Sequence, residues 1–303
     1  MTTGAIEAHR KGVMLVLAAA LCWSSGGLIA RYIAADTSTQ MIGRGFFAAV
    51  TLLLFLLIRD GRNTWSLFRG LGLPGLAVAF CFAIASSAFV VALQHATVAL
   101  ILVIQSTAPL IAALIAFVWM REPIGWVRGI AMLVALIGVW RMVSGGESGG
   151  DALGVGLSCA IALSIGLATV LVRRYRAIRM TPAMCIAAVL LMTCGLATRS
   201  GGAVSATDVT LLVLFGAGQL AIGMICFTSG ARLIPAGEAA LLGLSECVLG
   251  PLWVWLVLGE DPGEQAIFGG LLTIAAVAGN TVYDMLRVSR GTAASERTLG
   301  GPA

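Results

Sequence analysis

Charged residues are scarce in this chain of 303 residues. They make up 11% of the sequence, against 59% hydrophobic residues, and the mean hydropathy is +0.99. A soluble domain carries roughly 25% charge, so the chain lacks the polar surface that a water-soluble globule needs. The composition therefore indicates an integral membrane protein. The 38 glycines agree with this class, because glycine is more frequent in membrane helices than in soluble ones.

Signatures of metal, nucleotide and nucleic-acid binding are also missing. The seven cysteines stand singly in apolar runs, no C-x-x-C pair occurs and the chain has two histidines, so we expect neither a metal nor another cofactor. No G-x-x-x-x-G-K-[ST] segment is present, which leaves solute or proton gradients as the energy source. The formal charge of +5 does not indicate nucleic-acid binding, because the basic residues lie between apolar runs.

Ten apolar runs are present instead, and each is a candidate membrane span. A helix needs about 20 apolar residues to cross a hydrocarbon core of roughly 30 Å. Backbone amides must be paired inside lipid, which favours helices. We therefore expect an all-α integral membrane protein with ten transmembrane helices. The runs cover residues 12–33, 40–58, 71–93, 97–120, 124–143, 152–172, 181–199, 208–231, 236–258 and 264–286.

The basic residues predict the orientation of these spans. If the N-terminus is cytoplasmic, the nineteen Lys and Arg residues all fall on the cytoplasmic side except Arg31, Arg44, Arg141 and Arg199. This asymmetry follows the positive-inside rule and requires an even number of spans. Both termini are therefore expected in the cytoplasm.

Two pairs of segments indicate an internal repeat. Residues 12–33 align without a gap on residues 154–175, with Gly12 opposite Gly154. The fourth run ends FVWMREPIG and the ninth ends WLVLGEDPG, which sets Glu122 opposite Glu260. A unit of five helices is odd, so the halves would have opposite orientations, as in transporters that alternate around a midplane site. The expected 5+5 inverted-topology repeat comprises residues 12–143 and 152–287, with cytoplasmic tails at 1–11 and 288–303.

Several motifs resemble those of the drug/metabolite transporter superfamily, in its ten-helix EamA-type branch. They are LCWSSGGLIAR, GRGFFAAVTLLL, STAPLIAALIAFVWMRE and SECVLGPLWVWLVLGE. The family has a proline early in the fourth and ninth helices; Pro109 fits, whereas Cys247 stands at the second position. Arg121 replaces the family's glycine before Glu122. The resemblance implies a secondary transporter of the bacterial inner membrane. Members of this branch are usually exporters of metabolites, and among them the aromatic amino-acid exporters of bacteria are the nearest match to this sequence.

Three charged residues are candidates for function. Glu246 lies about ten residues into its run, near the midplane, where a charge costs about 2.5–3.5 kcal/mol on insertion scales. It could hold an ammonium group or exchange a proton, or it could stay protonated and join helices by hydrogen bonding. Glu238 is expected at the cytoplasmic interface, where it could mark the inner gate. Arg44 could bind a carboxylate or extend to the outer headgroups.

Neutral polar and aromatic residues at mid-depth complete the predicted site. Single Ser and Thr residues usually bond within the bundle, but the clusters in the first and fourth runs favour a cavity lining. We predict as substrate-binding residues Trp23, Ser24, Ser25, Phe82, Ser86, Gln105, Ser106, Ser164, Gln219, Glu246 and Trp253, with Arg44, Glu238 and Glu246 as gate or coupling candidates. His95 is expected in a short outer turn.

The expected function is export of amino acids or similar small amphipathic metabolites by alternating access. Phosphorylated substrates are disfavoured, because Arg44 is the one basic residue expected inside the bundle. The alternatives are an exporter of nucleoside- or cation-like solutes, an intramembrane enzyme and a channel. A serine protease would need a histidine within the spans, whereas His9 and His95 lie outside them, so we expect no enzyme. The expected partners are a small-molecule substrate and the lipid bilayer, with no nucleic acid, and the chain is expected to be monomeric.

Overall fold

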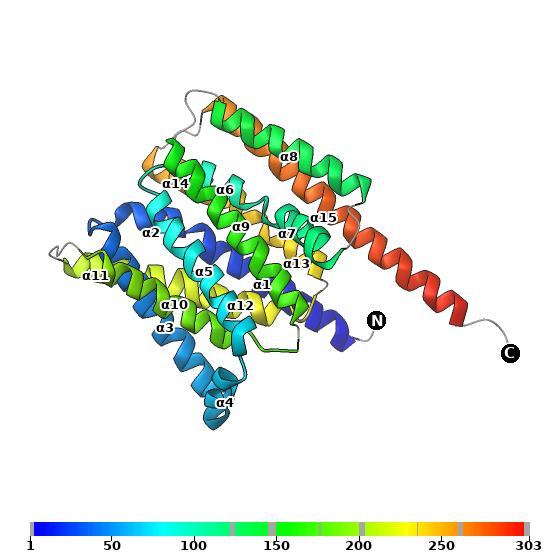
Figure 1. The fold of residues 1–303 in the computed structure, drawn as a ribbon, viewed down its shortest axis with the longest axis horizontal. Coiled ribbons are helices and arrows are strands. Elements are labelled where there is room, and N and C mark those ends of the chain that lie inside the picture. The colour runs from blue at the N-terminus through cyan, green and yellow to red at the C-terminus, as the bar shows by residue number, and fades with distance from the viewer. Residues whose placement is uncertain are drawn as a thin grey trace.

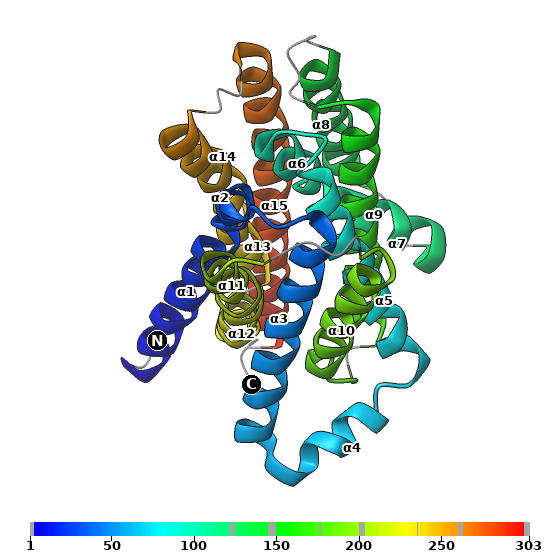
Figure 2. The same cartoon turned by 90° about the vertical axis from the view of Figure 1, so that its left-hand side faces the viewer.

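The computed structural model is an elongated bundle of helices (Figure 1). It describes residues 3–121, 125–144, 150–175, 177–199, 204–234, 236–259 and 263–299. Figure 2 shows that most of the helices run in one common direction. The all-helical class predicted from the composition is confirmed for the described residues. Glu122 and Glu260, which end the paired segments, lie outside them.

The first half of the chain contains nine helical elements in its described part. They are α1 (Thr3–Ser24), α2 (Gly26–Tyr32), α3 (Thr37–Asp60), the 3₁₀ turn η1 (Gly61–Asn63), α4 (Thr64–Arg69), α5 (Gly72–Ala92), α6 (Val98–Gln105), α7 (Ala108–Met120) and α8 (Trp126–Ser144).

The described second half begins at Asp151, which caps the next helix. Its elements are α9 (Ala152–Arg174), α10 (Thr181–Ala197), α11 (Ala206–Val213), the π-helix η2 (Leu214–Ile222), α12 (Gly223–Gly230), α13 (Ala236–Gly243), α14 (Ser245–Leu258) and α15 (Glu264–Leu299). Helix α15 continues past the predicted limit at 286, and Figure 1 shows its last turns extending beyond the bundle. The apolar pattern marks where a helix can meet lipid rather than where it ends, and residues 287–299 contain no proline to stop it.

Six helical stretches in the described residues are long and apolar enough to cross a membrane. They cover residues 6–32, 37–69, 72–92, 98–120, 152–174 and 206–230. Four shorter apolar helices lie at Gly129–Arg141, Thr181–Ala197, Ser245–Leu258 and Ile267–Tyr283. Each predicted run overlaps one of these stretches. The protein is thus a multi-pass membrane protein, and the count of ten crossings stays a prediction.

Three of the predicted runs are broken helices. The breaks fall at Ser25, between α1 and α2, at Ser106–Thr107, between α6 and α7, and at Leu244, between α13 and α14. At each break a serine hydroxyl donates to the carbonyl three residues earlier, with Oγ···O distances of 2.6 Å for Ser25, 2.7 Å for Ser106 and 2.6 Å for Ser245. Such bonds compete with the helical ladder and bend it. Broken helices inside a membrane are tolerated where they are buried in protein or line a cavity.

Hydrogen bonds join the connections at two ends of the bundle. Helix α3 has 24 residues, so its two ends lie about 36 Å apart. Beyond its start, Arg31 Nη2 donates to Ala96 O at 3.2 Å, and the Asp151 backbone N donates to His95 O at 2.9 Å. We call this the His95 end.

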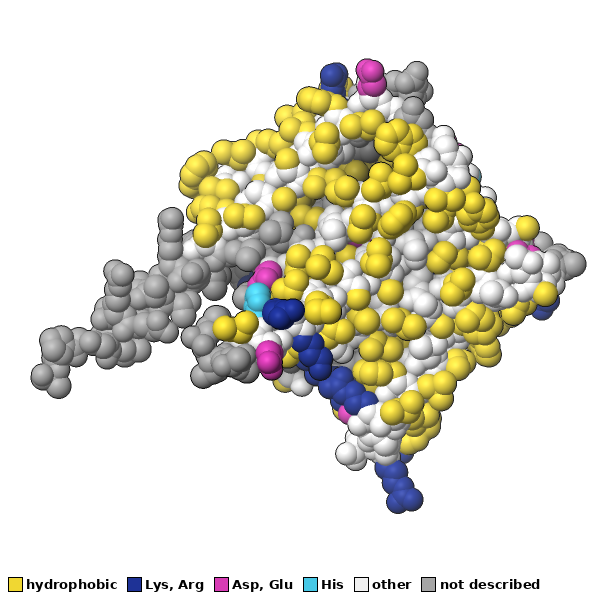
Figure 3. All heavy atoms as spheres, turned by 180° about the vertical axis from the view of Figure 1, so that it is seen from behind, with side chains coloured by type: hydrophobic (Ala, Val, Ile, Leu, Met, Phe, Trp, Pro, Cys, Tyr) yellow, Lys and Arg dark blue, Asp and Glu magenta, His cyan; other side chains and the backbone are white. Residues whose placement is uncertain are grey.

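The opposite end is joined by side chains. At the last residue of α3, Asp60 Oδ1 accepts from Arg179 Nη1 at 2.7 Å. On α1, His9 Nε2 lies 2.9 Å from Glu238 Oε2 of α13. We call this the His9 end. Figure 3 shows Lys and Arg side chains gathered along one edge of the molecule, with hydrophobic side chains over the adjoining face. The exposed apolar side chains include Ile58 and Leu73, at 86% and 82% exposure, and a surface of this kind suits lipid.

Helices far apart in sequence pack side by side. Helix α3 packs on α10, α8 on α15, α5 on α9 and α1 on α12, and Figure 1 shows α8 and α15 together along one side. Small residues allow these close approaches. Gly45 of α3 lies so near α10 that an added Cβ would be 2.6 Å from both Ala188 O and Met192 N.

Substituting Gly45 with Ala should therefore destabilise the bundle. Because both nearest atoms are backbone, α3 and α10 must move apart, and overpacking of this kind costs about 1–3 kcal/mol. Thermal unfolding in detergent, with Gly156→Ala as the matched control, measures the effect. Gly156 has no atom within 4 Å of an added Cβ, so the control should unfold at or above the wild-type temperature. Equal unfolding temperatures for the two variants would contradict the predicted contact.

Candidate functional site

Arg44 is buried in the second turn of α3, with 4% of its surface exposed. Its Nη2 donates to Gln219 Oε1 at 3.0 Å. Its guanidinium carbon lies 4.3 Å from the ring centroid of Phe215 and 5.1 Å from that of Phe89, within the range of cation–π attraction. The suggestion that Arg44 extends to the outer headgroups is therefore wrong, because side chains of the neighbouring helices η2 and α5 enclose the guanidinium.

The local sequence explains how the guanidinium is enclosed. Phe215 and Gln219 are four residues apart on η2, so they share one side of that helix. Gly216 brings η2 against α3, since a Cβ there would lie 2.6 Å from Arg44 O. A π-helix inserts an extra residue into a helical turn and is frequent at functional sites.

Much of the hydrogen-bonding capacity of Arg44 is unused. Its Nε and Nη1 atoms are buried and have no hydrogen-bond partner among the described residues. Together they carry three N–H donors. Buried donors without partners are costly, and a guanidinium fork matches a carboxylate geometrically. This end of the site is therefore suited to an anionic group.

Glu246 supplies the opposite charge. It lies in the first turn of α14, interacts electrostatically with Arg44 and has the side chain of Gln105 beside its carboxyl group. As a whole residue Glu246 has intermediate exposure. Its carboxyl group lies within electrostatic reach of the Arg44 guanidinium, so the two charged groups belong to one site.

A network of polar and aromatic contacts connects this charge pair to the break between α1 and α2. Gln219 Nε2 donates to Trp23 O at 3.3 Å, and Trp253 Nε1 donates to Ser24 Oγ at 3.2 Å. The rings of Trp23 and Phe227 lie 5.2 Å apart. Residues of α1, α12, η2 and α14 thus converge beside the break and form an aromatic wall.

The structure places the predicted substrate-binding residues in two groups. The first group belongs to the network around Arg44 and consists of Trp23, Ser24, Gln105, Gln219, Glu246 and Trp253. In the second group, the hydroxyls of Ser25 and Ser106 bond within their own helices. Phe82 packs in an apolar cluster with residues such as Leu52 and Met184. Among the described residues, no hydrogen bond joins Ser86 or Ser164 to Arg44 or Glu246, and Ser164 is 9% exposed.

Two aromatic residues of this site were missed by the sequence interpretation. Phe89 and Phe215 are the rings beside the Arg44 guanidinium. A signal existed, because Phe89 follows Ser86 by three residues and Phe215 precedes Gln219 by four. Residues at these spacings share one helix face.

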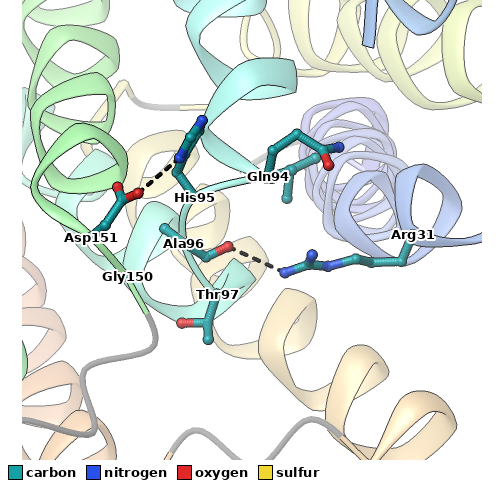
Figure 4. Close-up of a pocket in the computed structure, with 8 residues that line it drawn as sticks. Arg31, Gln94, His95, Ala96, Thr97, Gly150 and Asp151 are labelled. Atoms are coloured by element: carbon teal, nitrogen blue, oxygen red, sulfur yellow. Dashed lines mark hydrogen bonds and ion pairs between the residues drawn. The ribbon is translucent and has the colours of Figure 1, made fainter. Parts of the chain in front are cut away.

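A second polar region lies at the His95 end (Figure 4). It is an open depression of about 360 Å³ whose lining does not include Glu246; the lining residues are Arg31, Leu93, Gln94, His95, Ala96, Thr97, Gly150 and Asp151. Figure 4 shows Arg31 reaching toward the Ala96 carbonyl from the side opposite Asp151. His95 Nδ1 lies 2.9 Å from Asp151 Oδ2, so the predicted outer histidine has a charged partner.

Asp151 is held ionised by its surroundings. Its Oδ1 accepts the backbone N–H of Gly154 at 2.8 Å, capping α9, and its Oδ2 meets His95. These two contacts, the Gly154 N–H first, lower the pKa of Asp151 below its ordinary value. At the other end, Glu238 contacts His9, and 24% of its side chain is exposed. Among the described residues, no group of three or more His, Cys, Asp or Glu side chains could hold a metal ion.

Comparison with known proteins agrees with this architecture. The model of the EamA-like transporter family matches residues 10–144 and again residues 149–282. No curated protein is similar enough in sequence to match. A crystal structure of a protein at 19% identity shares the fold, with a TM-score of 0.61 over 90% of this chain and 96% of that chain. Since the family model covers most of the chain and the described part is a bundle of apolar helices, the protein belongs to the EamA-like transporter family, a family of membrane transporters of small solutes within the drug/metabolite transporter superfamily.

Proposed function

We propose that the protein exports amino acids, or similar small zwitterionic metabolites, by alternating access around the Arg44 site. The observation that carries this proposal is a buried guanidinium with unpaired donors in the same site as a carboxyl group. A zwitterion presents a carboxylate and an ammonium group a few ångströms apart. Arg44 would pair with the first and Glu246 with the second, replacing the attraction that each has for the other.

The charge balance of the site disfavours other solutes. A phosphorylated solute carries about two negative charges, which one guanidinium opposite one carboxyl group does not balance. A cationic drug would be attracted by Glu246 but would leave the donors of Arg44 unpaired. The rings of Trp23, Phe227 and Trp253 favour an amphipathic or aromatic side chain on the solute.

The pattern of helix contacts supports alternating access by two inverted repeats. If the halves are related, each predicted span corresponds to the span five places later. A contact between two helices should then recur between their counterparts: the contact of α1 with α12 corresponds to that of α9 with α5, and the contact of α1 with α14 to that of α9 with α7. In the pairs α3–α10 and α8–α15, each helix is the counterpart of the other. All of these pairs of helices are in contact. The family model also matches the chain twice. Two related halves of this kind can rock about a shared midplane site.

The orientation is part of the proposal. Arg10, Lys11, Arg59, Arg62 and Arg179 lie near the residues that join the His9 end. By the positive-inside rule, that end would be cytoplasmic and the His95 end external, in a bacterial inner membrane. Export would then carry the solute from the His9 end to the His95 end.

Counterflow in proteoliposomes tests this function. Vesicles preloaded with one unlabelled amino acid at a time, across a panel that includes the aromatic amino acids, should accumulate the labelled form in a saturable way. Protein-free vesicles are the control. Repeating the measurement with a pH gradient reveals whether protons are coupled to transport. Counterflow of a nucleoside or an organic cation, with none for any amino acid, would replace the proposed substrate class with the alternative one.

A further inference from the structure

The two histidines of the chain occupy related places at opposite ends of the bundle. His9 Nε2 of α1 lies 2.9 Å from Glu238 Oε2 of α13. His95 Nδ1, between α5 and α6, lies 2.9 Å from Asp151 Oδ2 at the start of α9. Each pair therefore connects the two halves of the chain that the family model matches. One partner belongs to α1 or to the turn after α5, and the other belongs to α13 or caps α9.

The internal repeat relates the two pairs. The register that sets Gly12 opposite Gly154 also sets His9 opposite Asp151. The register that sets Glu122 opposite Glu260 places His95 opposite Leu233, in the segment that leads to α13 and Glu238. His9 thus corresponds to Asp151, whereas Glu238 lies five residues after the position opposite His95, and one His–carboxylate pair results at each end.

Backbone packing shows the same correspondence independently. A Cβ on Gly12 would lie 2.6 Å from Ile234 Cγ2 and 2.8 Å from Leu233 Cβ. A Cβ on Gly154 would lie 2.5 Å from His95 O and 2.8 Å from Ala96 Cβ. Under the two registers the same contact is made once in each half of the chain, so each His–carboxylate pair lies near a close approach between the halves.

We propose that the two pairs are proton-responsive latches, which hold the two mouths of the transport path closed in turn. This inference rests on the alternating-access function proposed above. Both pairs are formed in this structure, and in each pair the partners belong to different halves, so a rocking motion that opens one end would separate one pair while it preserves the other. Since Arg31 lines the depression beside His95, the mouth at that end is polar and reached by solvent.

Protonation of histidine is the step that sets the strength of each latch. Histidine ordinarily gains or loses its charge between pH 5 and 8. When the histidine is protonated, each pair is an ion pair; when it is neutral, the attraction between charges is lost while a hydrogen bond can remain. Asp151, whose pKa is lowered by Gly154 N–H and His95, stays ionised throughout. The stabilisation due to that lowering is lost only as the pH falls below about 4, outside this range.

Other charged groups face the pairs from neighbouring elements. At the His95 end, Arg31 of α2 is the further charged side chain among those that line the depression. At the His9 end, Glu7, Arg10 and Lys11 lie on α1 close to His9 in sequence, and Arg232 follows α12, which packs on α1.

Hydrogen–deuterium exchange of the purified full-length protein in nanodiscs tests the latches without any solute. Exchange is measured at pH 5.5 and pH 8 and corrected for the intrinsic pH dependence. In the wild type, residues 93–97 and residues 236–243 should each exchange about two- to fivefold faster at pH 8, as expected for partly exposed ion pairs. In His95→Gln the difference in exchange rate between the two pH values should disappear at residues 93–97 and remain at residues 236–243. In His9→Gln it should disappear at residues 236–243 and remain at residues 93–97.

A second variant covers the possibility that His95→Gln perturbs folding. Asp151→Asn removes the charge but keeps an N-cap acceptor for Gly154, and should also remove the ratio at 93–97. The proposal would be overturned if His95→Gln kept the wild-type ratio of exchange rates between pH 8 and pH 5.5 at residues 93–97. It would also be overturned if all three variants changed exchange equally at both ends of the bundle. Because the measurement needs no transport, an absence of amino-acid counterflow would count against the proposed substrate and leave the exchange result standing.

Discussion

Replacing Arg44 with Gln should reduce the apparent affinity for a zwitterionic solute by at least about thirtyfold. The reason is that a carboxylate would lose the buried donors Nε and Nη1, and removing one partner of a buried, hydrogen-bonded charge pair costs 2 kcal/mol or more. The concentration dependence of counterflow measures this change. The variant should also discriminate less between an amino acid and the amine that lacks its carboxylate, because that carboxylate no longer has a specific partner.

Arg59→Gln is the matched control. Arg59 lies on the same helix and also stacks on a ring, with its guanidinium carbon 5.8 Å from the Phe55 centroid, but it is exposed at the His9 end. The control should keep the wild-type affinity. Should Arg44→Gln not fold, Arg44→Lys keeps the charge and loses the planar fork, so a smaller loss of affinity is expected. Wild-type affinity in Arg44→Gln would show that the guanidinium is a structural brace between α3 and η2.

Replacing Glu246 with Gln should reduce the flux of amino acids at least about tenfold. Gln has nearly the same size, so packing is kept while the charge that would hold the ammonium group is removed. A hydrogen bond to a charged group contributes about 1.5–3 kcal/mol, and tenfold corresponds to the lower end of that range. The flux of the deaminated analogue should fall less, since that solute has no ammonium group. Initial rates of counterflow for both solutes give the comparison.

Glu264→Gln provides the control for this change. It makes the same replacement at an exposed position in the first turn of α15, and both fluxes should remain at the wild-type level. An equal loss of both fluxes in Glu246→Gln, together with a lower unfolding temperature, would mean that Glu246 holds helices together. Unchanged fluxes over a wide pH range would lead to the same conclusion.

The positions of the broken helices show which features of the fold the local sequence can predict. Pro109 and the serines near each break are visible in the chain, because proline removes a backbone donor and serine competes for helical carbonyls. The π-helix Leu214–Ile222 was not predicted. Its extra residue per turn changes which side chains face α3, and a pattern that assumes an ordinary helical turn does not show this.

The pairing of the histidines was also beyond the sequence. His9 was assigned to a cytoplasmic tail, yet it lies within α1 and contacts a residue 229 positions later. Both histidines stand outside the apolar runs, where hydropathy carries no information about neighbours. Only the packing of α1 on α12 and α13 brings the acid to the imidazole.

By itself the sequence determined the membrane class and the positions of the apolar helices, because transfer from water to lipid depends on composition along the chain. The tertiary structure decided which way Arg44 points, which rings enclose it and which carboxylates meet the histidines. These depend on the rotation of each helix about its axis and on its neighbours. When apolar residues occupy every face of a helix, hydropathy constrains neither its rotation nor its choice of neighbours strongly. Close contacts such as that of Gly45 with α10 fix the rotation and the neighbours together.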